Sequence, residues 1–251
     1  MVRGQYIAGT GMLLQRRLME NITHNITNAD TTGYKKEHLV SHSFDEVMIR
    51  RIKDNHVVGH TFIAGPLNLG TQIDQLYINF EEGALEGTER TTDLALIGDA
   101  FFVVLTEDGE RYTRCGAFYI DQAGYLADGE GHLLLGNNGP IYVGGLNFHV
   151  SEYGDVTIDG RYIDTIKVAS FADNGQLRKQ GSNLYYSLED PLAAANPHKI
   201  LQGYLETSNV DIAREMVDMI TVFRTYETNQ RMLTMIDEIA GKAVNEIGRL
   251  R

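Results

Sequence analysis

The chain has 251 residues, with 22 basic and 34 acidic side chains and a formal net charge of −12 at pH 7. Its single cysteine excludes an intramolecular disulfide scaffold and a four-cysteine zinc site. The acidic balance argues against a nucleic-acid-binding protein, which needs a basic face for phosphates.

The charge is unevenly distributed along the chain. Residues 1–53 carry 8 basic and 5 acidic groups, residues 54–206 carry 8 and 22, and residues 207–251 carry 6 and 7. All 4 prolines and 20 of the 26 glycines lie in the middle block. Two near-neutral ends around an acidic, turn-rich centre predict an inserted domain whose flanking segments come back together.

The N-terminal segment from residue 5 to about residue 28 has the apolar spacing of an amphipathic helix. Asn28–Gly33 is expected to end it, because its side chains bond their own backbone and Gly33 tolerates positive φ. A secretory signal needs about 7–15 consecutive apolar residues, and a membrane span needs about 20. The sequence predicts neither. The apolar stripe of the helix comprises Ala8, Met12, Met19, Ile22, Ile26 and Ala29.

Residues 34–85 are expected to form an irregular connecting segment, with a short helix over 44–52 and a loop over 56–69. The chain that follows, residues 86–204, is predicted to form β structure. Short apolar runs alternate with Asp-Gly and Asn-Gly turns, which is typical of antiparallel hairpins. The runs expected to be strands are 95–97, 101–105, 117–120, 133–135, 141–143, 156–158 and 163–171.

The C-terminal segment has the most regular apolar spacing, and we expect a helix of about 40 residues, roughly 60 Å long. Ser208 or Asn209 is the expected N-cap. The seven-residue repeat tends towards a coiled-coil seam. Because the N-terminal helix is shorter, part of this apolar stripe must contact another molecule or stay exposed. The stripe comprises Ile212, Met216, Met219, Phe223, Tyr226, Leu233, Ile236, Ala240 and Ile247.

No motif predicts a catalytic, metal or cofactor site, so we expect a protein that is not an enzyme and has no cofactor. His38 and His42, like His56 and His60, are spaced by four but have no adjoining Glu to complete a metalloprotease pattern. The Asp-Gly turns lack the alternating ligands and distal Glu of a calcium loop. Cys115 has Arg114 beside it but no evident His partner, so an unreactive cysteine is expected.

Three stretches resemble motifs of the flagellar hook–basal body family, most closely its rod proteins. The first, Asn21–Lys36, matches at Asn25, Asn28, Ala29, Thr31, Thr32, Gly33, Tyr34 and Lys35. The second, Asp93–Tyr125, matches at Gly98, Phe101, Phe102, Tyr112, Thr113, Arg114, Gly116, Phe118, Asp121 and Gly124. The third, Gln202–Ile236, matches at Gly203, Leu205, Glu206, Ser208, Asn209, Val210, Met219, Ile220, Arg224 and Tyr226. The segment 178–200 has a length similar to that in proximal-rod proteins. The residues from Tyr204 to Val210 are instead similar to those of distal-rod proteins.

The resemblance implies an α+β fold, in which a discontinuous domain of paired, coiled-coil-like terminal helices carries an inserted antiparallel β-rich domain. The expected domains are a terminal assembly domain of 1–33 plus 205–251, a connecting segment of 34–85, and an outer β-rich domain of 86–204. It implies a structural subunit of the bacterial flagellar rod, self-assembling into a hollow helical tube that transmits torque from motor to hook. The implied partners are copies of itself, neighbouring rod and hook subunits and the flagellar export apparatus, with export to the basal body without signal cleavage.

The alternative left by the residues is a secreted or surface acidic β-domain that binds carbohydrate or calcium through its turns. Calcium binding that raises the melting temperature would favour this alternative. Self-assembly would favour a rod subunit.

Overall fold

The computed structural model describes residues 2–50, 63–145, 147–181, 183–187, 190–192 and 197–247. It is an α+β structure with antiparallel strands that divides into two compact units. The first unit comprises Met1–Ile26, Glu37–Tyr77 and Ile212–Arg251, and the second comprises Thr27–Lys36 and Ile78–Asp211. Each unit is described by itself.

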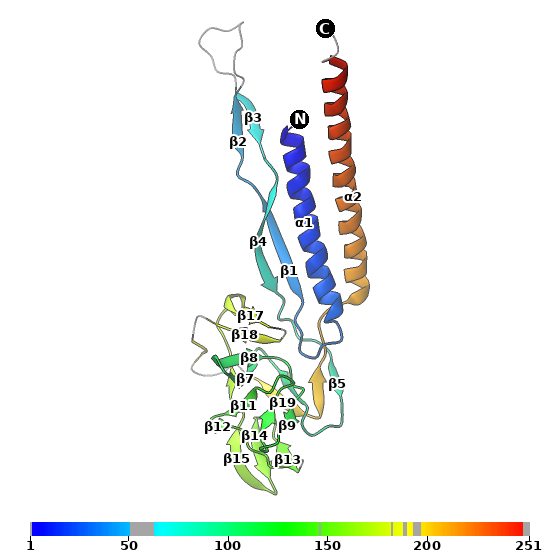
Figure 1. Cartoon of the computed structure of the whole chain (residues 1–251). Helices are drawn as coiled ribbons and strands as arrows, with labels where there is room; N and C mark the ends of the chain where they lie inside the picture. Colours follow the sequence, from blue (N-terminus) through cyan, green and yellow to red (C-terminus); the bar gives the residue numbers. More distant parts are fainter. Residues whose placement is uncertain are drawn as a thin grey trace. The chain divides into compact units, whose positions relative to one another are not determined.

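The first unit contains two long helices, α1 (Val2–Thr27) and α2 (Ile212–Lys242), which lie side by side in opposite directions (Figure 1). α2 continues into a π-helical turn, Ala243–Ile247. Near one end of the pair, Gln5 Nε2 donates a hydrogen bond of 2.9 Å to Asp237 Oδ1. Two glycines of α1 allow close approach, because a Cβ on Gly4 would lie 3.2 Å from Ile236 and one on Gly11 would lie 3.0 Å from Asn229. Neither helix is apolar enough over its length to cross a membrane.

The N-terminal helix is confirmed, and the C-terminal helix is confirmed with a later start. It begins at Ile212 rather than beside Ser208 or Asn209. The side chain of Asn209 is not a helix cap here, because it bonds to backbone groups of Lys36, Asn79 and Glu81. Because these bonds occupy the side-chain amide of Asn209, it does not cap the helix as the sequence predicts.

A two-part hairpin also belongs to the first unit. Strand β1 (Glu37–Ser43) pairs with β4 (Thr71–Ile78), and β2 (Val47–Arg50) pairs with β3 (Ile63–Leu67). The expected short helix over 44–52 is therefore wrong where β2 runs. The apolar run that starts at Val47 pairs across the ribbon, with Val47 opposite Leu67, instead of packing as a helix. The expected loop over 56–69 is also wrong where β3 runs, because Ile63–Leu67 pairs with β2. Residues 56–62 of that expected loop lie outside the described residues.

The second unit is built on a nine-stranded antiparallel sheet with the order β17-β18-β8-β7-β11-β10-β9, to which β12 and β16 add at β11 and β7. The bounds are β7 Phe101–Thr106, β8 Gly109–Thr113, β9 Tyr119–Ile120, β10 Leu126–Ala127, β11 Leu133–Gly136, β12 Gly139–Pro140, β16 Val168–Ala169, β17 Arg178–Gln180 and β18 Leu184–Tyr186. A 3₁₀ turn, Asn174–Gln176, precedes β17.

Three smaller sheets complete the second unit. One has the order β13-β14-β15, with β13 Phe148–Val150, β14 Asp155–Ile158 and β15 Arg161–Thr165. The others pair β6 (Leu94–Ile97) with β19 (Lys199–Gln202) and β5 (Leu85–Gly87) with β20 (Tyr204–Glu206). Most expected strands are confirmed. The run 141–143 forms only a bridge from Tyr142 to Tyr125, and 163–171 divides between β15 and β16.

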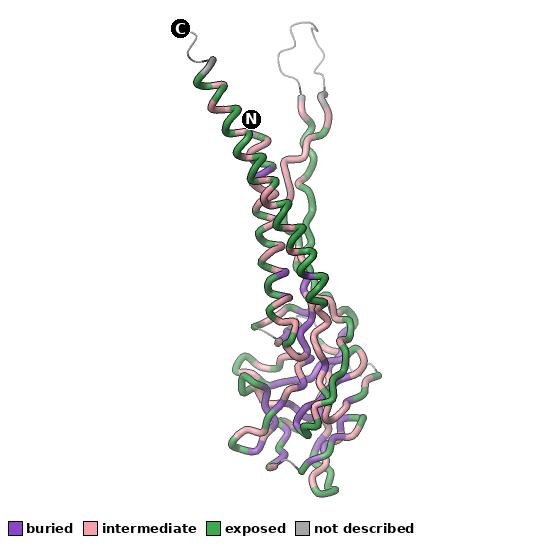
Figure 2. Tube along the Cα trace, turned by 90° about the vertical axis from the view of Figure 1, so that its right-hand side faces the viewer, coloured by how far each residue is buried: buried purple, intermediate pink, exposed green. Residues whose placement is uncertain are grey.

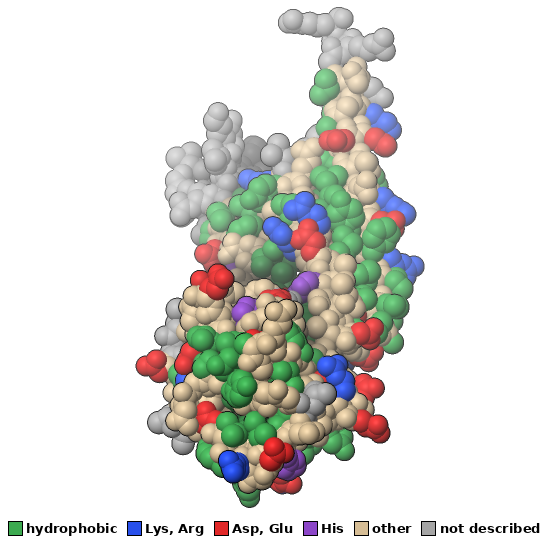
Figure 3. Space-filling view, turned by 60° about the horizontal axis from the view of Figure 1, so that its bottom comes forward, with side chains coloured by type: hydrophobic (Ala, Val, Ile, Leu, Met, Phe, Trp, Pro, Cys, Tyr) green, Lys and Arg blue, Asp and Glu red, His purple; other side chains and the backbone are tan. Residues whose placement is uncertain are grey.

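The buried residues concentrate in the strands of the second unit, whereas most helix residues are exposed or half-buried (Figure 2). One face of β7 packs Phe102 and Val104 into a mainly aliphatic cluster, and the other packs Phe101 and Val103 into a cluster that is half aromatic. This follows from the alternation of side chains along a strand that is covered on both faces. Acidic side chains are spread over the face of this unit seen in Figure 3 rather than gathered in one place.

Candidate functional site

Two oppositely charged side chains from opposite ends of the sequence meet in the interior of the second unit. Lys35 Nζ lies 2.6 Å from Glu206 Oε1, and the two side chains are only 1% and 2% exposed. Lys35 also donates to the carbonyl of Glu81, and Glu206 Oε1 accepts from the amide of Gly83. Buried charges are tolerated when they are paired and hydrogen-bonded in this way.

A third charge from the middle of the sequence joins the pair. Arg114 Nη1 lies 3.5 Å from Glu206 Oε2, and both side chains are buried. The guanidinium donates to the carbonyls of Leu96 and Gly98 and stands 5.1 Å from the ring centroid of Phe101. We call Lys35, Arg114 and Glu206 the charge cluster. Its three members come one from each of the three motif stretches.

Burial also shifts the pKa of one member of the cluster, Lys35. It lowers the pKa of the Lys35 ammonium from its ordinary value of 10.5, and the nearby Glu206 carboxylate offsets part of that effect. The desolvation of the cation therefore outweighs its ion pair.

Gly33 allows the N-terminal stretch to approach the chain that carries Arg114. Its φ is +67°, and a Cβ there would lie 2.5 Å from the backbone of Arg114 and Cys115. The amide of Gly33 donates to the carbonyl of Glu206 at 2.8 Å. Both the backbone conformation and the contact require glycine at this position.

Asn209 ties three segments of the second unit together. Its Oδ1 accepts from the amide of Lys36 at 2.7 Å, and its Nδ2 donates to the carbonyls of Asn79 and Glu81. The amide of Asn79 in turn donates to the carbonyl of Lys36. The two backbone segments at 36 and 79 are thus bonded to each other and to the residue that closely precedes α2.

In the first unit, Asn25 joins α1, β1 and α2. Its amide accepts from Glu37 N at 3.1 Å, donates to Glu37 O at 2.9 Å and lies 3.2 Å from Glu215 Oε2. Asn25, Glu37 and Glu215 are all buried. One amide side chain therefore fixes the end of α1 against the start of β1 and the first turn of α2.

The predicted site residues divide between these networks, the core and the surface. On the N-terminal side, Ala8, Ile22, Asn25, Gly33 and Tyr34 are buried, while Met12, Met19, Ile26, Asn28, Ala29 and Thr32 are half-buried. In the central motif, all residues are buried except the half-buried Gly98 and Asp121, and Asp121 Oδ1 accepts from Tyr125 N across the turn closed by Gly124. On the C-terminal side, Ser208, Asn209, Val210, Met219, Tyr226, Leu233, Ile236 and Ala240 are half-buried, and Ile212, Met216 and Phe223 are exposed. The side chain of Ile247 lies outside the described residues.

The sequence does not predict the contacts within the charge cluster. Its three residues were matched to separate motifs, but no spacing predicts that they meet across 171 residues of chain. The only signal was that a charged residue in each motif stands close to a glycine, as Lys35 does to Gly33, Arg114 to Gly116 and Glu206 to Gly203.

Other candidate ligands are not gathered in the described part of the chain. His38 and His42 lie on strand β1, so they do not share a helix face, and His56 and His60 lie outside the described residues. Among the described residues, no group of three or more His, Cys, Asp or Glu side chains could hold a metal ion. Cys115 is a free cysteine whose Sγ lies 3.4 Å from Thr32 Oγ1.

Large apolar side chains such as Ile220 and Phe223 stay exposed on α2. Exposed apolar patches of this kind mark surfaces through which proteins interact. The family model described as flagellar basal body rod FlgEFG protein C-terminal matches residues 201–246, which include Glu206. The model described as flagellar hook protein FlgE/F/G D1 domain matches residues 95–181, which include Arg114.

Full-length relatives agree with these matches. The flagellar hook-basal body complex protein FlhO of Bacillus subtilis (strain 168) is 32% identical, with 100% of both chains covered. The flagellar basal-body rod protein FlgG of the same organism is 33% identical, covering 98% of this chain and 99% of the relative. FlgG of Borreliella burgdorferi is 30% identical, covering 98% of each chain. The chain therefore belongs to the flagellar hook–basal body family of rod proteins.

Proposed function

We propose that this protein is a structural subunit of the bacterial flagellar rod, which assembles with copies of itself and with neighbouring rod and hook subunits. In this role the terminal helices pair in coiled-coil fashion and pack against those of other subunits to form the wall of a hollow tube. The tube transmits torque from motor to hook. Full-length similarity to rod proteins supports this role.

The observation that carries the proposal is the apolar surface left on α2. Ile212, Met216, Ile220 and Phe223 are between 38% and 58% exposed in the single chain. Four large apolar side chains at spacings of four, four and three form a continuous ridge on one helix face. Contact with other subunits would remove that ridge from water.

We assign the assembly function to 1–33 plus 205–251, the connection to 34–85 and the outer layer to 86–204. The N-terminal assembly motif contains residues from Ala8 to Tyr34, the C-terminal one residues from Ser208 to Ile247, and the β motif residues from Gly98 to Gly124. The subunit is exported through the flagellar secretion channel without cleavage of a signal and works outside the cytoplasm in the basal body. It does so as a non-enzymatic protein without a cofactor or nucleic-acid ligand.

Electron microscopy of the purified chain, alone and with the neighbouring rod subunits of its organism, tests this function. We expect helical tubes or short polymers, and we expect deletion of the gene to abolish swimming. A deletion strain that swims normally would contradict the proposal. Nothing in the comparisons supports a carbohydrate- or calcium-binding β-domain, and calorimetry with calcium provides the direct check on that alternative.

A further inference from the structure

The first unit has an apolar groove on the exposed side of α1. We call it the α1 groove. Its cavity of about 640 Å³ is lined mainly by side chains from the first half of α1, with one residue from α2. A Cβ on Gly9 would have no atom within 4 Å, so this glycine leaves a notch in the floor of the groove. The lining residues are Gln5, Tyr6, Gly9, Thr10, Met12, Leu13, Arg16 and Tyr226.

The α2 ridge, formed by Ile212, Met216, Ile220 and Phe223, lies too far along the bundle to fill the groove of its own chain. In the helix pair, Gly4 approaches Ile236 and Gly11 approaches Asn229. The same antiparallel register places Gly9 level with residue 231. That level is about eleven residues, or roughly 17 Å, from Ile220.

We propose that the α2 ridge of one copy packs into the α1 groove of the next copy in the assembled rod, an inference that rests on the proposed function. In subunits that point the same way, α2 of one copy runs antiparallel to α1 of its neighbour. The groove positions Tyr6, Gly9, Leu13 and Arg16 then face Phe223, Ile220, Met216 and Ile212. Ile220 enters the notch at Gly9, as a ridge side chain enters a groove between helices.

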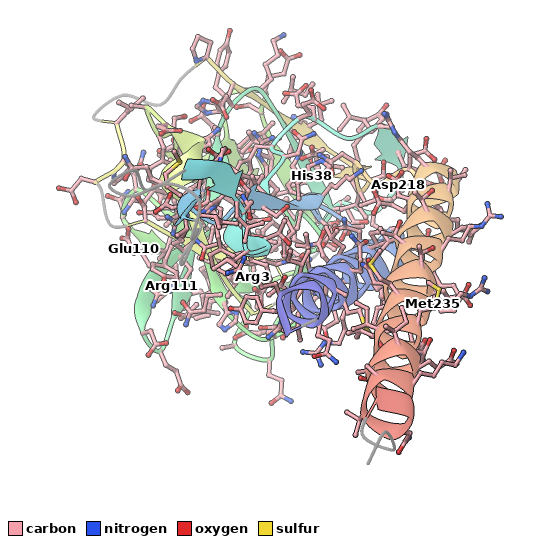
Figure 4. All side chains as sticks on the ribbon, turned by 90° about the horizontal axis from the view of Figure 1, so that it is seen from above. Arg3, His38, Glu110, Arg111, Asp218 and Met235 are labelled. Carbon is pink, nitrogen blue, oxygen red and sulfur yellow. The ribbon has the colours of Figure 1, made fainter. Side chains whose placement is uncertain are left out.

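The charges of the two helix segments favour the same pairing. Residues 1–19 contain three arginines and no acidic residue, which gives +3. Residues 212–227 contain three acidic residues and two arginines, which gives −1. Arg3 and Asp218, labelled in Figure 4, are members of these two segments. Opposite net charges promote contact between the segments and disfavour pairing of α1 with a second α1.

The contact has a definite symmetry. Ridge and groove are different surfaces, so each copy offers one of each and the interaction is heterologous. Because they are displaced along the helices, successive copies are staggered by roughly 17 Å, given 1.5 Å of rise per residue. A staggered heterologous contact does not close on itself and generates an open filament.

Disulfide trapping in assembled protein tests the register. In a Cys115→Ser background, the variant Gly9→Cys with Ile220→Cys should give a ladder of covalent oligomers on oxidation. The two positions of one chain are too far apart to be bridged, since a disulfide needs Cα atoms about 4.4–6.8 Å apart. The matched control pairs Gly9→Cys with Val217→Cys, which is exposed but lies off the ridge, and should give no ladder.

Filling the notch is the second test. Gly9→Leu should leave the helical circular dichroism of the monomer unchanged and reduce the assembled fraction at least tenfold. Gly241→Leu, at another helix glycine with open space around it, should assemble normally. Polymers without the 9–220 cross-link would overturn this inference and leave the proposed function standing. Covalent dimers from Gly9→Cys alone would overturn it as well, because they show a symmetric contact. Failure of the unmodified chain to polymerise, alone or with its neighbouring subunits, would overturn both.

Discussion

At residue 206 a single carboxylate balances two buried cations. Glu206→Gln removes the charge that faces Lys35 and Arg114 and leaves both cations uncompensated in the interior. We expect a loss of about 3–5 kcal/mol in the free energy of unfolding, the usual cost of breaking a buried ion pair from one side. Urea unfolding followed by circular dichroism measures this loss.

An exposed ion pair supplies the control for that substitution. Glu152 Oε2 lies 2.9 Å from Lys199 Nζ, and both side chains are more than half exposed. Glu152→Gln should leave the unfolding midpoint unchanged, because solvent screens such pairs. Equal effects of the two substitutions would show that burial of the charge cluster has no energetic consequence.

The lowered pKa of Lys35 predicts a pH dependence of stability. Between that lowered pKa and 10.5, the unfolded chain keeps a proton on Lys35 that the folded chain has released. The free energy of unfolding should therefore rise with pH across this window, relative to a Lys35→Met variant. Burial raises the pKa of Tyr112, so the folded chain keeps this proton above pH 10 and the free energy of unfolding falls with pH there. This effect is common to the parent protein and the Lys35→Met variant, so it cancels in their difference. Urea unfolding from pH 8 to 10.5 gives the comparison, and a constant difference would contradict it.

Gly33 is expected to tolerate no side chain. Gly33→Ala meets the Arg114 backbone and must adopt a φ of +67°, whereas Gly181→Ala has nearly the same φ of +68° and open space. The left-handed conformation alone costs roughly 1–2 kcal/mol. We expect the loss for Gly33→Ala to exceed that for Gly181→Ala by about 2 kcal/mol, a difference typical of overpacking. Thermal unfolding of the two variants tests this, and similar melting temperatures would exclude a steric role.

At the scale of elements, the helix pair depends on how each helix end is joined to the strands. Asn25→Asp places a second carboxylate beside Glu215 and removes the amide donor to Glu37 O. We expect a loss of about 1–3 kcal/mol, because buried polar groups lose their partners. Hydrogen exchange should accelerate at the start of β1 and in the first turn of α2. Gln5→Ala, which removes the exposed bond to Asp237, should not change exchange at those amides.

The elements differ in how well the sequence predicts them. α1 and α2 follow from apolar spacing over many turns, and β7 follows from an apolar run closed by an Asp-Gly turn. The sequence does not predict strands β1 and β20, because their pairing depends on partners far away in the chain rather than on their own residues. For the same reason the sequence places Lys35, Arg114 and Glu206 in motifs but does not predict that they touch.

At the scale of the whole molecule, the charge asymmetry predicts where added charge is tolerated. Met219→Glu with Leu233→Glu introduces two acids on the half-buried side of α2 and should prevent rod assembly. Tyr153→Glu, at a side chain of the second unit that is 78% exposed, should allow it. Electron microscopy of basal bodies and swimming assays compare the variants. Normal rods from the Met219→Glu, Leu233→Glu protein would refute our account of the near-neutral ends.

The backbone crosses between the two units several times, and hydrogen bonds link these crossings. The chain passes between them at 26–27, 36–37, 77–78 and 211–212. The bonds among Lys36, Asn79 and Asn209 tie the last three of these passages to one another. Pulling the backbone apart at one of these three passages would therefore also break hydrogen bonds to the other two.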